Sequence, residues 1–404
     1  MIFSLLRITF ILLWLQAPHK ILRGFLYVEL SLEEYRKLEC CRVNQEYMEM
    51  ALQLAENVAG QTSPNPPVGA VLVKDGRIIG MGAHLEAGER HAERVALDMA
   101  GARATGADLY VTLEPCSHTG KTSPCANAVI QAGIKRVYIA TTDPNPLVAG
   151  NGIAKLLEAG VEVTEGLYNE RAKKLYESFF HFIKHKTPHV TMKTAMTIDG
   201  KIATSTGDSK WVTSEQARLD VHQLRHTQDA ILVGVQTLLH DNPLLTTRLP
   251  LGGKHPIRVI LDTSLRTPEF SQVIQNTEAP TWIFCGKYAE LSHEKLLRKP
   301  HVQIIRMQKP QLIVEDILLE LGKRGVMTLL VEGGAAINAS FVKARAVQKV
   351  ICYVAPKLLG GTGSLTPIGG LDPQLMDDAF PFAFESVEMI GPDIKIIAVP
   401  KESD

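Results

Sequence analysis

Cysteine and aromatic residues are scarce in this chain of 404 residues. The six cysteines are too few and too irregularly spaced for a disulfide framework, and such sparse use is typical of a reducing compartment. They are Cys40, Cys41, Cys116, Cys125, Cys285 and Cys352. An excess of charge is also lacking, because 43 basic residues balance 43 acidic ones. The chain therefore lacks the general attraction to nucleic acids or anionic membranes that a basic protein has.

A run of apolar residues long enough to cross a membrane is missing too. The stretch from Ile8 to Leu15, apolar apart from Thr9, is far shorter than the ~20 residues that a transmembrane helix needs. Arg7 before an apolar run resembles a secretory signal, but no small-residue cleavage site follows it. We therefore expect residues 1–43 to be an extension outside the fold, which would begin near Asn44. We also expect a cytoplasmic protein.

The most informative residues are His91 and Glu93 in HAERVAL, followed by Cys116 and Cys125 in EPCSHTGKTSPC. One imidazole and two thiolates can hold a zinc ion tetrahedrally and leave a fourth position for water. Zinc lowers the pKa of such a water to about 7, and a carboxylate two residues after the histidine can then transfer protons. Because this arrangement is typical of nucleobase deaminases, we predict a catalytic zinc site with Glu93 as the proton shuttle.

Two simpler interpretations of these residues stay open. Isolated cysteines are usually buried as small apolar groups, and a structural zinc site would have four protein ligands. His118 is close enough in the chain to be a fourth ligand. The general deaminase pattern has only two residues between its cysteines, whereas here Ser117 through Pro124 separate them. A loop of that length must serve some purpose besides holding metal.

The apolar spacing of the first half predicts alternating helices and strands. We expect helices at 46–59, 91–100, 124–133 and 168–184, strands at 68–73, 77–84, 107–113 and 136–141, and a helix-strand unit at 152–164. Both metal-ligand motifs fall where a strand gives way to a helix, and helix N-termini would favour thiolates there. A three-layer α/β sandwich is therefore predicted for residues 44–186.

A second α/β run follows a predicted linker at 185–190. It is expected to contain strands at 190–196, 229–234, 257–262, 281–286, 328–332, 348–354, 384–390 and 393–399, and helices at 214–226, 312–322 and 335–344. The chain length also favours two domains, which we place at 44–186 and 187–404.

Three segments of the second half carry chemical groups. Lys193 and Asp199 stand at the two ends of one strand-turn unit, and a polar loop with Asp241 and Arg248 follows ILVGVQT. In LLVEGGAAINASF (329–341), paired glycines join a buried strand to a helix, which lets backbone N–H groups approach a phosphate. A Gly-Gly turn without any ligand is an equally good interpretation of that string taken alone.

From about Asn44 to its end, the chain resembles the bifunctional riboflavin-biosynthesis deaminase/reductases of bacteria. The matching strings include PNPPVGAVLVKDGRIIGMGAHLEAGERHAE, YVTLEPCSHTGKTSPC, TIDGKIATSTGDSKWVTS, HDNPLLTTR and VEGGAA. The resemblance implies an α/β fold with a cytidine-deaminase-like N-terminal domain and a dihydrofolate-reductase-like C-terminal domain. It also implies two reactions. The 2-amino group of 2,5-diamino-6-ribosylamino-4-pyrimidinone 5′-phosphate is removed by hydrolysis, and NADPH then reduces the ribosyl side chain to ribityl.

The resemblance further implies substrate-binding residues in the deaminase half. The positions around the base and sugar are Asn65, His84, Asp143 and Asn145, and those around the substrate phosphate are Ser117, His118 and Lys121. The phosphate set would explain the long loop between the two cysteines. Turn formation is the alternative for each asparagine and aspartate taken singly. The family string His-Ala-Glu-Val-His is altered here, because Arg94 and Val95 replace its last two residues.

In the reductase half the resemblance implies one set of substrate positions and one set of cofactor positions. The substrate positions are Lys193, Ser209, Arg225, Leu245, Arg248 and Glu332. The cofactor positions are Ala195, Trp211, Thr237, Asp241, Thr263 or Ser264, and the turn of Gly334, Ala335, Ala336, Ile337, Asn338, Ala339 and Ser340. We expect Lys193 to stabilise the ring-opened or imine form of the sugar, although an isolated lysine is usually a solvated surface charge. Arg266 and Lys287 are both candidates for binding the 2′-phosphate of NADPH.

Two other functions are compatible with the zinc motif alone. A polynucleotide base deaminase with a C-terminal binding domain would share it, but the sequence has no basic stretch interleaved with aromatic residues. A non-catalytic zinc scaffold would have no need of Glu93. We therefore expect one zinc ion per chain, NADPH and small pyrimidine ribose phosphates as ligands, and neither nucleic acid nor membrane as a partner. The family suggests a homo-oligomer.

Overall fold

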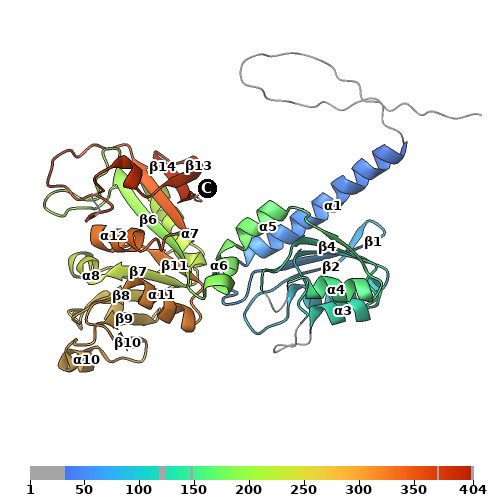
Figure 1. Ribbon diagram of the computed structural model, residues 1–404, viewed down its shortest axis with the longest axis horizontal. Helices are drawn as coiled ribbons and strands as arrows, with labels where there is room; N and C mark the ends of the chain where they lie inside the picture. Colours follow the sequence, from blue (N-terminus) through green and yellow to red (C-terminus); the bar gives the residue numbers. More distant parts are fainter. Residues whose placement is uncertain (1–31, 118–123, 146–148, 371–372, 402–404) are drawn as a thin grey trace, which may run out of the picture.

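The computed structural model describes residues 32–117, 124–145, 149–370 and 373–401, with only the backbone described for 32–43. These ranges form two α/β units in sequence order, one built on a five-stranded sheet and the other on a nine-stranded sheet (Figure 1). None of the helices in the described ranges is both long and apolar enough to cross a membrane.

The first unit has helices on both faces of its sheet (Figure 1). Its strands are β1 (Gly69–Lys74), β2 (Arg77–Ala83), β3 (Asp108–Leu113), β4 (Arg136–Thr141) and β5 (Glu162–Glu165). Its helices are α1 (Leu32–Asn57), α2 (Ala92–Ala100), the 3₁₀ turn η1 (Gly101–Ala104), α3 (Cys125–Gln131), α4 (Asn151–Glu158), α5 (Asn169–Leu175) and α6 (Glu177–His185). The strand order is β2-β1-β3-β4-β5, in which β1 is antiparallel to both neighbours and β3, β4 and β5 are parallel.

Alternation of side chains along β1 produces the three layers. Leu72 packs with apolar residues of α2, α3 and α4 on one face, whereas Val71 packs with residues of α1, α5 and α6 on the other. Successive residues of a strand point to opposite faces, so a continuous apolar strand fits a sheet that is covered on both sides. The predicted hairpin is present, and its turn places Asp75 and Gly76 at positive φ, as a tight two-residue connection requires.

Two predicted helix boundaries in this unit are wrong. The first helix was expected at 46–59, but α1 begins at Leu32 and therefore includes part of the expected extension. The single helix expected at 168–184 is two helices, α5 and α6, which meet at Tyr176. Tyr176 is fully buried, and its hydroxyl lies 2.6 Å from Thr112 Oγ1 in the sheet. The chain bends at the point where this large side chain enters the core.

The second unit contains a longer and mostly parallel sheet. Its strands are β6 (His189–Thr197), β7 (Ala230–Gly234), β8 (Ile257–Leu261), β9 (Thr281–Cys285), β10 (Val302–Arg306), β11 (Thr328–Val331), β12 (Lys349–Ala355), β13 (Phe382–Ile390) and β14 (Asp393–Pro400). Its helices are α7 (Glu215–Thr227), α8 (Val235–Asp241), α9 (Gln272–Gln275), α10 (Leu291–Leu297), α11 (Val314–Lys323), α12 (Ala335–Lys343) and the 3₁₀ turn η2 (Met376–Asp378). The order is β10-β9-β8-β7-β11-β6-β12-β14-β13, parallel from β10 to β12 and antiparallel thereafter.

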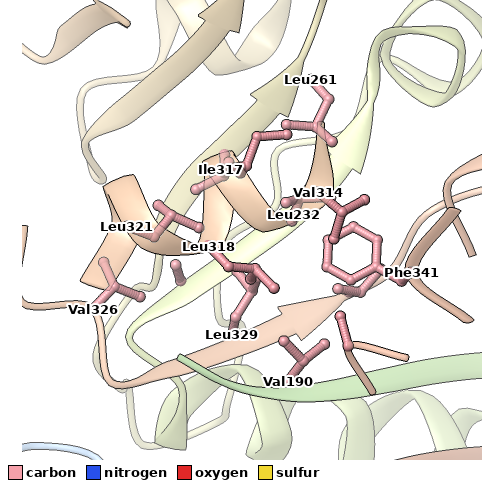
Figure 2. Close-up of a cluster of buried hydrophobic side chains, with 14 of the residues drawn as sticks. Val190, Leu232, Leu261, Val314, Ile317, Leu318, Leu321, Val326, Leu329 and Phe341 are labelled. Atoms are coloured by element: carbon pink, nitrogen blue, oxygen red, sulfur yellow. The ribbon is translucent and has the colours of Figure 1, made fainter. Parts of the chain in front are cut away.

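The apolar core of this unit lies between the sheet and helices α11 and α12. Figure 2 shows Leu318 and Leu321 of α11 together with Phe341 of α12, close to Leu232 and Leu329 of the sheet. Burying each of these side chains contributes ~1.5–3 kcal/mol relative to leaving it exposed. A second cluster covers the opposite face of β7 and β8 and contains apolar residues of α8, α9 and α10. Because both faces are covered, ligands can reach the parallel strands only at their ends.

Candidate functional site

Three segments of the first unit bring His91, Cys116 and Cys125 together. His91 directly precedes α2, Cys116 follows β3, and Cys125 is the first residue of α3. The Nδ1 atom of His91 is 3.6 Å from Cys116 Sγ and 3.3 Å from Cys125 Sγ, and the three donor atoms lie within 4.8 Å of one another. Two sulfurs and an imidazole nitrogen at this spacing fit the coordination sphere of zinc. Within the described ranges no fourth side chain of a ligating type joins the group, and His118 lies outside those ranges.

Hydrogen bonds in this group favour the ionised form of Cys116. The thiol of Cys125, the ring of His91 and the backbone N–H of Cys125 all donate to Cys116 Sγ. These donors lower the pKa of the Cys116 thiol to about 4 in spite of its burial. The contact with Cys116 also raises the pKa of His91. The thiolate is the form of cysteine that binds metal, so the site is prepared for a cation.

Glu93 lies in the first turn of α2 and is only 3% exposed. Burial raises the pKa of its carboxyl, and the negative charge of Cys116 raises it further. The side chain of Cys125 opposes this rise in part, because it is close enough to the carboxyl to interact with it, and Glu93 therefore lies at the ligand group. A carboxyl with a raised pKa holds a proton more readily than an ordinary glutamate does, so it can take one up and pass it on. The arrangement therefore has the chemistry of a proton shuttle.

His84 and Asn65 form a polar contact next to His91. His84 is 2% exposed, and its ring lies 5.2 Å from the ring of His91 in an edge-to-face arrangement. Its Nδ1 is 3.1 Å from the carbonyl oxygen of Arg90, and its Nε2 is 3.1 Å from Asn65 Nδ2. The ring therefore donates from Nδ1 and accepts at Nε2, and burial lowers its pKa. With both nitrogens engaged, His84 holds Asn65 and the segment before His91 in position.

The loop after β4 carries Asp143 and Asn145. Asp143 is buried, and its Oδ1 accepts a hydrogen bond of 2.8 Å from the backbone N–H of Asn145. Of the three residues expected at the substrate phosphate, the structure places only Ser117, which is half-buried directly after Cys116. His118 and Lys121 lie outside the described residues.

Glu114 is a functional candidate that our sequence interpretation missed. It is 4% exposed and separated from Cys116 only by Pro115. Its carboxylate accepts four backbone N–H groups of the β4–α4 segment, at 3.4 Å from Asp143, 3.0 Å from Gly150, 2.8 Å from Gly152 and 3.3 Å from Ile153. It thereby ties the loop that carries Asp143 to the cysteine segment. The sequence did contain a signal for Glu114, which stands two residues before the ligand Cys116 in the string EPC. A carboxylate at that place needs hydrogen-bond donors, and these come from a distant part of the chain that only the fold brings close.

The second unit contains a cavity of about 700 Å³ at the ends of its parallel strands. Most of the reductase positions implied by the sequence line it. They are Lys193, Ala195, Ser209, Trp211, Arg225, Thr237, Asp241, Arg248, Thr263, Glu332, Gly334, Ala335, Ala336, Ile337 and Asn338. The structure therefore gathers residues from both ends of the unit into one place.

Four of the implied positions do not line this cavity. Leu245 is buried in the apolar cluster around β7 and has a positive φ of 56°, so only its backbone is suited to a ligand contact. Ser264 lies directly after the lining residue Thr263. Ala339 and Ser340 line a smaller cavity of about 360 Å³ on the same helix, α12. Asp199 is not at the cavity either; it accepts backbone N–H groups of Leu359 and Gly360.

Charged side chains meet at Glu332 on one side of the cavity. Arg225 donates two hydrogen bonds to its carboxylate, at 2.8 and 2.9 Å, and Lys193 Nζ lies 3.8 Å away. Burial alone would raise the pKa of Glu332, but the charges of Arg225 and Lys193 overcome it and hold the pKa at about 2. Burial lowers the pKa of Lys193, which Glu332 opposes only in part. A buried lysine with a lowered pKa beside a fixed carboxylate is able to release a proton.

His222 on α7 also lines the cavity and was missed in the sequence. Its Nδ1 accepts a hydrogen bond of 3.3 Å from the backbone N–H of Arg248. Burial and the charges of Arg225 and Arg248 lower its pKa to about 4, so the ring is neutral. The proton then sits on Nε2, and His222 is a hydrogen-bond donor for a ligand at this end of the cavity. In the sequence, a histidine within a predicted helix gives no sign that it will line a cavity.

Comparisons with known proteins agree with this division into two sites. Residues 41–141 match the model of the cytidine and deoxycytidylate deaminase zinc-binding region, and residues 188–396 match that of the RibD C-terminal domain. A riboflavin biosynthesis protein RibD of Bacillus amyloliquefaciens is 49% identical over 356 residues, which cover 88% of this chain and 96% of the relative. That of Actinobacillus pleuropneumoniae is 44% identical over 86% of this chain and 93% of the relative.

Solved structures resemble this chain over both of its units. RibD of Acinetobacter baumannii superimposes with a TM-score of 0.81 at 34% identity, over 90% of this chain and 100% of the other. A diaminohydroxyphosphoribosylaminopyrimidine deaminase/5-amino-6-(5-phosphoribosylamino)uracil reductase of Thermotoga maritima has a TM-score of 0.81 at 38% identity, with the same coverage. These matches confirm the predicted fold class, a cytidine-deaminase-like domain followed by a dihydrofolate-reductase-like domain.

Proposed function

Because this chain belongs to the RibD family of bifunctional riboflavin-biosynthesis deaminase/reductases, we propose that its two sites act in turn on one small pyrimidine ribose phosphate. The predicted cofactors, zinc for the first domain and NADPH for the second, are those of this family. The first site removes the ring 2-amino group of 2,5-diamino-6-ribosylamino-4-pyrimidinone 5′-phosphate. The second reduces the ribosyl group and so yields 5-amino-6-(5-phosphoribitylamino)uracil.

The observation that carries the first step is the contact of buried Glu93 with the group of His91, Cys116 and Cys125. Zinc bound by these three side chains supplies a Lewis acid that activates water for attack on the ring carbon. Glu93 takes up one proton of that water and gives it to the ring nitrogen. It then takes the remaining proton from the hydroxyl newly formed on the ring carbon and gives it to the amino group, which leaves as ammonia while the carbonyl forms. We assign base and sugar contacts to Asn65, and, in the loop that Glu114 holds, to Asp143 and Asn145. Ser117, His118 and Lys121 bind the phosphate.

The second step uses the charged group around Glu332. NADPH supplies the hydride that reduces the first carbon of the sugar. Lys193 gives a proton to the substrate as the sugar ring opens, and it stabilises the resulting imine. Arg225 holds Glu332 ionised, so that Glu332 can orient Lys193 and accept hydrogen bonds from sugar hydroxyls. Ser209, Arg248 and the backbone of Leu245 bind the substrate phosphate.

We assign the cofactor to the rest of the cavity. Nicotinamide lies towards Ala195 and Trp211, and the pyrophosphate lies at the N-terminal turn of α12, residues 334–340. Backbone N–H groups at such a turn attract an anion, and the helix dipole adds to that attraction. Thr237 and Asp241 of α8, with Thr263 or Ser264 after β8, contact the remaining ribose and phosphate groups.

The proposal also includes the domain bounds, the cellular location and the partners of the protein. The two catalytic domains are residues 44–186 and 187–404, although helix α1 already begins at Leu32, within the expected extension of residues 1–43. The protein works in the cytoplasm, where reducing conditions keep the cysteine ligands as thiols. It forms a homo-oligomer and binds neither nucleic acid nor membrane. The balanced charge of the chain favours small substrates over a polynucleotide.

Ammonia release and NADPH oxidation, measured on the purified full-length chain together with its zinc content, test the function. We expect about one zinc per chain, ammonia release from the diamino pyrimidine phosphate, and NADPH oxidation only once the deaminated product is present. A chain that deaminates an oligonucleotide but not the free pyrimidine phosphate would instead be a polynucleotide deaminase. A folded, metal-free sample with full deaminase activity would contradict the zinc mechanism.

A further inference from the structure

We propose that Arg266 binds the 2′-phosphate of NADPH and selects this cofactor over NADH. The inference rests on the proposed reductase function and adds a specificity-determining residue to it. Sequence left Arg266 and Lys287 as equal candidates. Four observations in the second unit distinguish them: the strand order, the helix ends at the cavity, the partners of the other cations, and the contact of Arg266 with Asp262.

The strand order separates the two ends of the cofactor. Lys193 and Ala195 lie on β6, whereas Arg266 follows β8, and β11 and β7 stand between those two strands. Neighbouring strands are about 4.8 Å apart, so β6 and β8 are separated by about 14 Å. The cavity extends across all four strands, because residues beside each of them line it. A dinucleotide is long enough to cross this distance, whereas the sugar of the substrate is not.

The helix ends between β6 and β8 fix the direction of the cofactor. Gly334 precedes α12 and Gly234 precedes α8, and both glycines line the cavity. Added Cβ atoms at Gly234 and Gly333 would lie 2.8 and 2.6 Å from Ile337, so the backbone of both turns is packed closely against α12. The pyrophosphate belongs at the N–H groups of the longer of the two helices, α12. Since hydride transfer must occur beside Lys193, the adenosine half extends the other way, towards Thr263 and Arg266.

Three other cations of the cavity have partners near the reacting end, and a fourth, Arg248, is assigned above to the substrate phosphate. Arg225 and Lys193 face Glu332, and Arg218 stacks over the Trp211 ring with its guanidinium carbon 4.6 Å from the centroid. Arg266 is the cationic side chain that lines the cavity from the β8 side, among the described residues. Lys287 does not line it; its ammonium lies 5.5 Å from the centroid of the Tyr288 ring.

Asp262 holds Arg266 near the cavity without using up its donors. Asp262 is fully buried, and its Oδ2 accepts hydrogen bonds from the backbone and hydroxyl of Thr267 at 2.7 and 2.8 Å. Its Oδ1 has no hydrogen-bond partner within the described residues, but the Nε of Arg266 lies 3.8 Å away. This distance gives attraction between charges without a hydrogen bond. The half-exposed guanidinium can therefore turn its fork of N–H groups to a phosphate.

The pair of Arg266 and Asp262 also explains why the site would select against NADH. With Arg266 present, a 2′-phosphate gains a charge-assisted contact that a 2′-hydroxyl cannot match. Without Arg266, the uncompensated carboxylate of Asp262 repels the phosphate but leaves the hydroxyl of NADH unaffected. Removing the arginine should therefore weaken the binding of NADPH far more than that of NADH.

Calorimetric titration of the full-length protein with adenosine 2′,5′-bisphosphate and with adenosine 5′-monophosphate tests the inference without turnover. We expect Arg266→Ala and Arg266→Gln to weaken the bisphosphate by on the order of 10- to 100-fold and to change the monophosphate little. Arg266→Lys should recover part of the loss, and Lys287→Ala should bind as the unmodified protein does. Steady-state NADPH oxidation should show the same ratio in KM.

Each of the other possible outcomes contradicts a particular part of the proposal. If both neutral variants of Arg266 fold, as their melting temperatures would show, and still bind the bisphosphate normally, the assignment is wrong although the reductase function stands. If Lys287→Ala loses the preference instead, the 2′-phosphate lies at Lys287. If the unmodified protein binds neither NADPH nor the bisphosphate, the proposed reductase function fails, and this inference fails with it.

Discussion

Lys254 Nζ of the reductase unit donates a hydrogen bond of 2.5 Å to the carbonyl oxygen of Gly60 in the deaminase unit. The same ammonium lies 3.1 Å from the carboxylate of Asp229, which also accepts the backbone N–H groups of Met327 and Thr328. A buried carboxylate at the start of β7 and β11 thus anchors the lysine that holds the deaminase chain. The two units are therefore joined by backbone and side-chain contacts and not by their linker alone.

Gly60→Ala tests this joint. Gly60 has a φ of 88°, and an added Cβ would lie 2.5 Å from the Cα of Thr227 at the end of α7. Because neither backbone can give way easily, we expect a loss of about 2 kcal/mol or more, seen as a lower melting temperature. Gly76→Ala is the matched control, since it has a φ of 72° but nothing within 4 Å of the added atom, and should cost about 1 kcal/mol. Equal losses in both variants would show that the joint adds nothing.

Glu114→Gln tests the loop that carries Asp143. The amide retains one acceptor oxygen but presents an NH₂ group to backbone N–H donors, so part of the loop is released. We expect KM for the diamino pyrimidine to rise about 10-fold, with zinc content and NADPH oxidation unchanged. Glu158→Gln, at the exposed end of α4, is the control and should leave KM as it is. Loss of zinc from the Glu114 variant would instead make Glu114 a support of the metal site.

Cys116→Ala tests the independence of the two sites. Removal of one of three ligand side chains should reduce bound zinc and lower ammonia release by at least about 100-fold. Reduction of the supplied uracil intermediate should be largely retained, because none of the described residues of the first unit lines the reductase cavity. Metal analysis and the two activity assays on one preparation provide the measurement. Loss of both activities in a folded sample would contradict separate sites.

Lys193→Ala should impair reduction and leave deamination intact. Loss of the proton donor beside Glu332 should lower the rate of NADPH oxidation by about 100- to 10,000-fold, while ammonia release continues. Lys295→Ala, an exposed lysine of α10, is the control and should oxidise NADPH normally. Unchanged oxidation by the Lys193 variant would remove Lys193 from the catalytic group.

His189→Gln should change how stability depends on pH. Burial, helped by the charge of Lys349, lowers the pKa of His189 from 6.5 to about 4. Its neutral form is therefore the folded form, and stability is complete above pH 6.5. As the pH falls from 6.5 to 4, the unfolded chain binds a proton that the folded chain does not, and stability falls by up to about 3 kcal/mol. Melting temperatures at several pH values should decrease less in the variant, and parallel curves would contradict the prediction.

Local periodicity predicted most of the elements because their apolar faces follow the period of a strand or a helix. The strand expected at 136–141 coincides with β4, and the helix expected at 91–100 differs from α2 by one residue. The short elements α9, α10 and β10 were missed. They are only four to seven residues long, and β10 is a half-exposed edge strand, so their patterns are too short or too mixed to be distinguished from a loop.

The sequence by itself determined the chemistry of this protein, because ligand and acid–base character belong to residue type. His91, Glu93, Cys116 and Cys125 indicate zinc-assisted deamination wherever the chain brings them together. Only the tertiary structure decided which distant groups support that chemistry. It placed the four N–H groups on Glu114, the neutral ring of His222 at the cavity, and Arg266 rather than Lys287 beside it. Such contacts join residues far apart in the chain, and their proximity is set by how helices and strands pack, which no local pattern encodes.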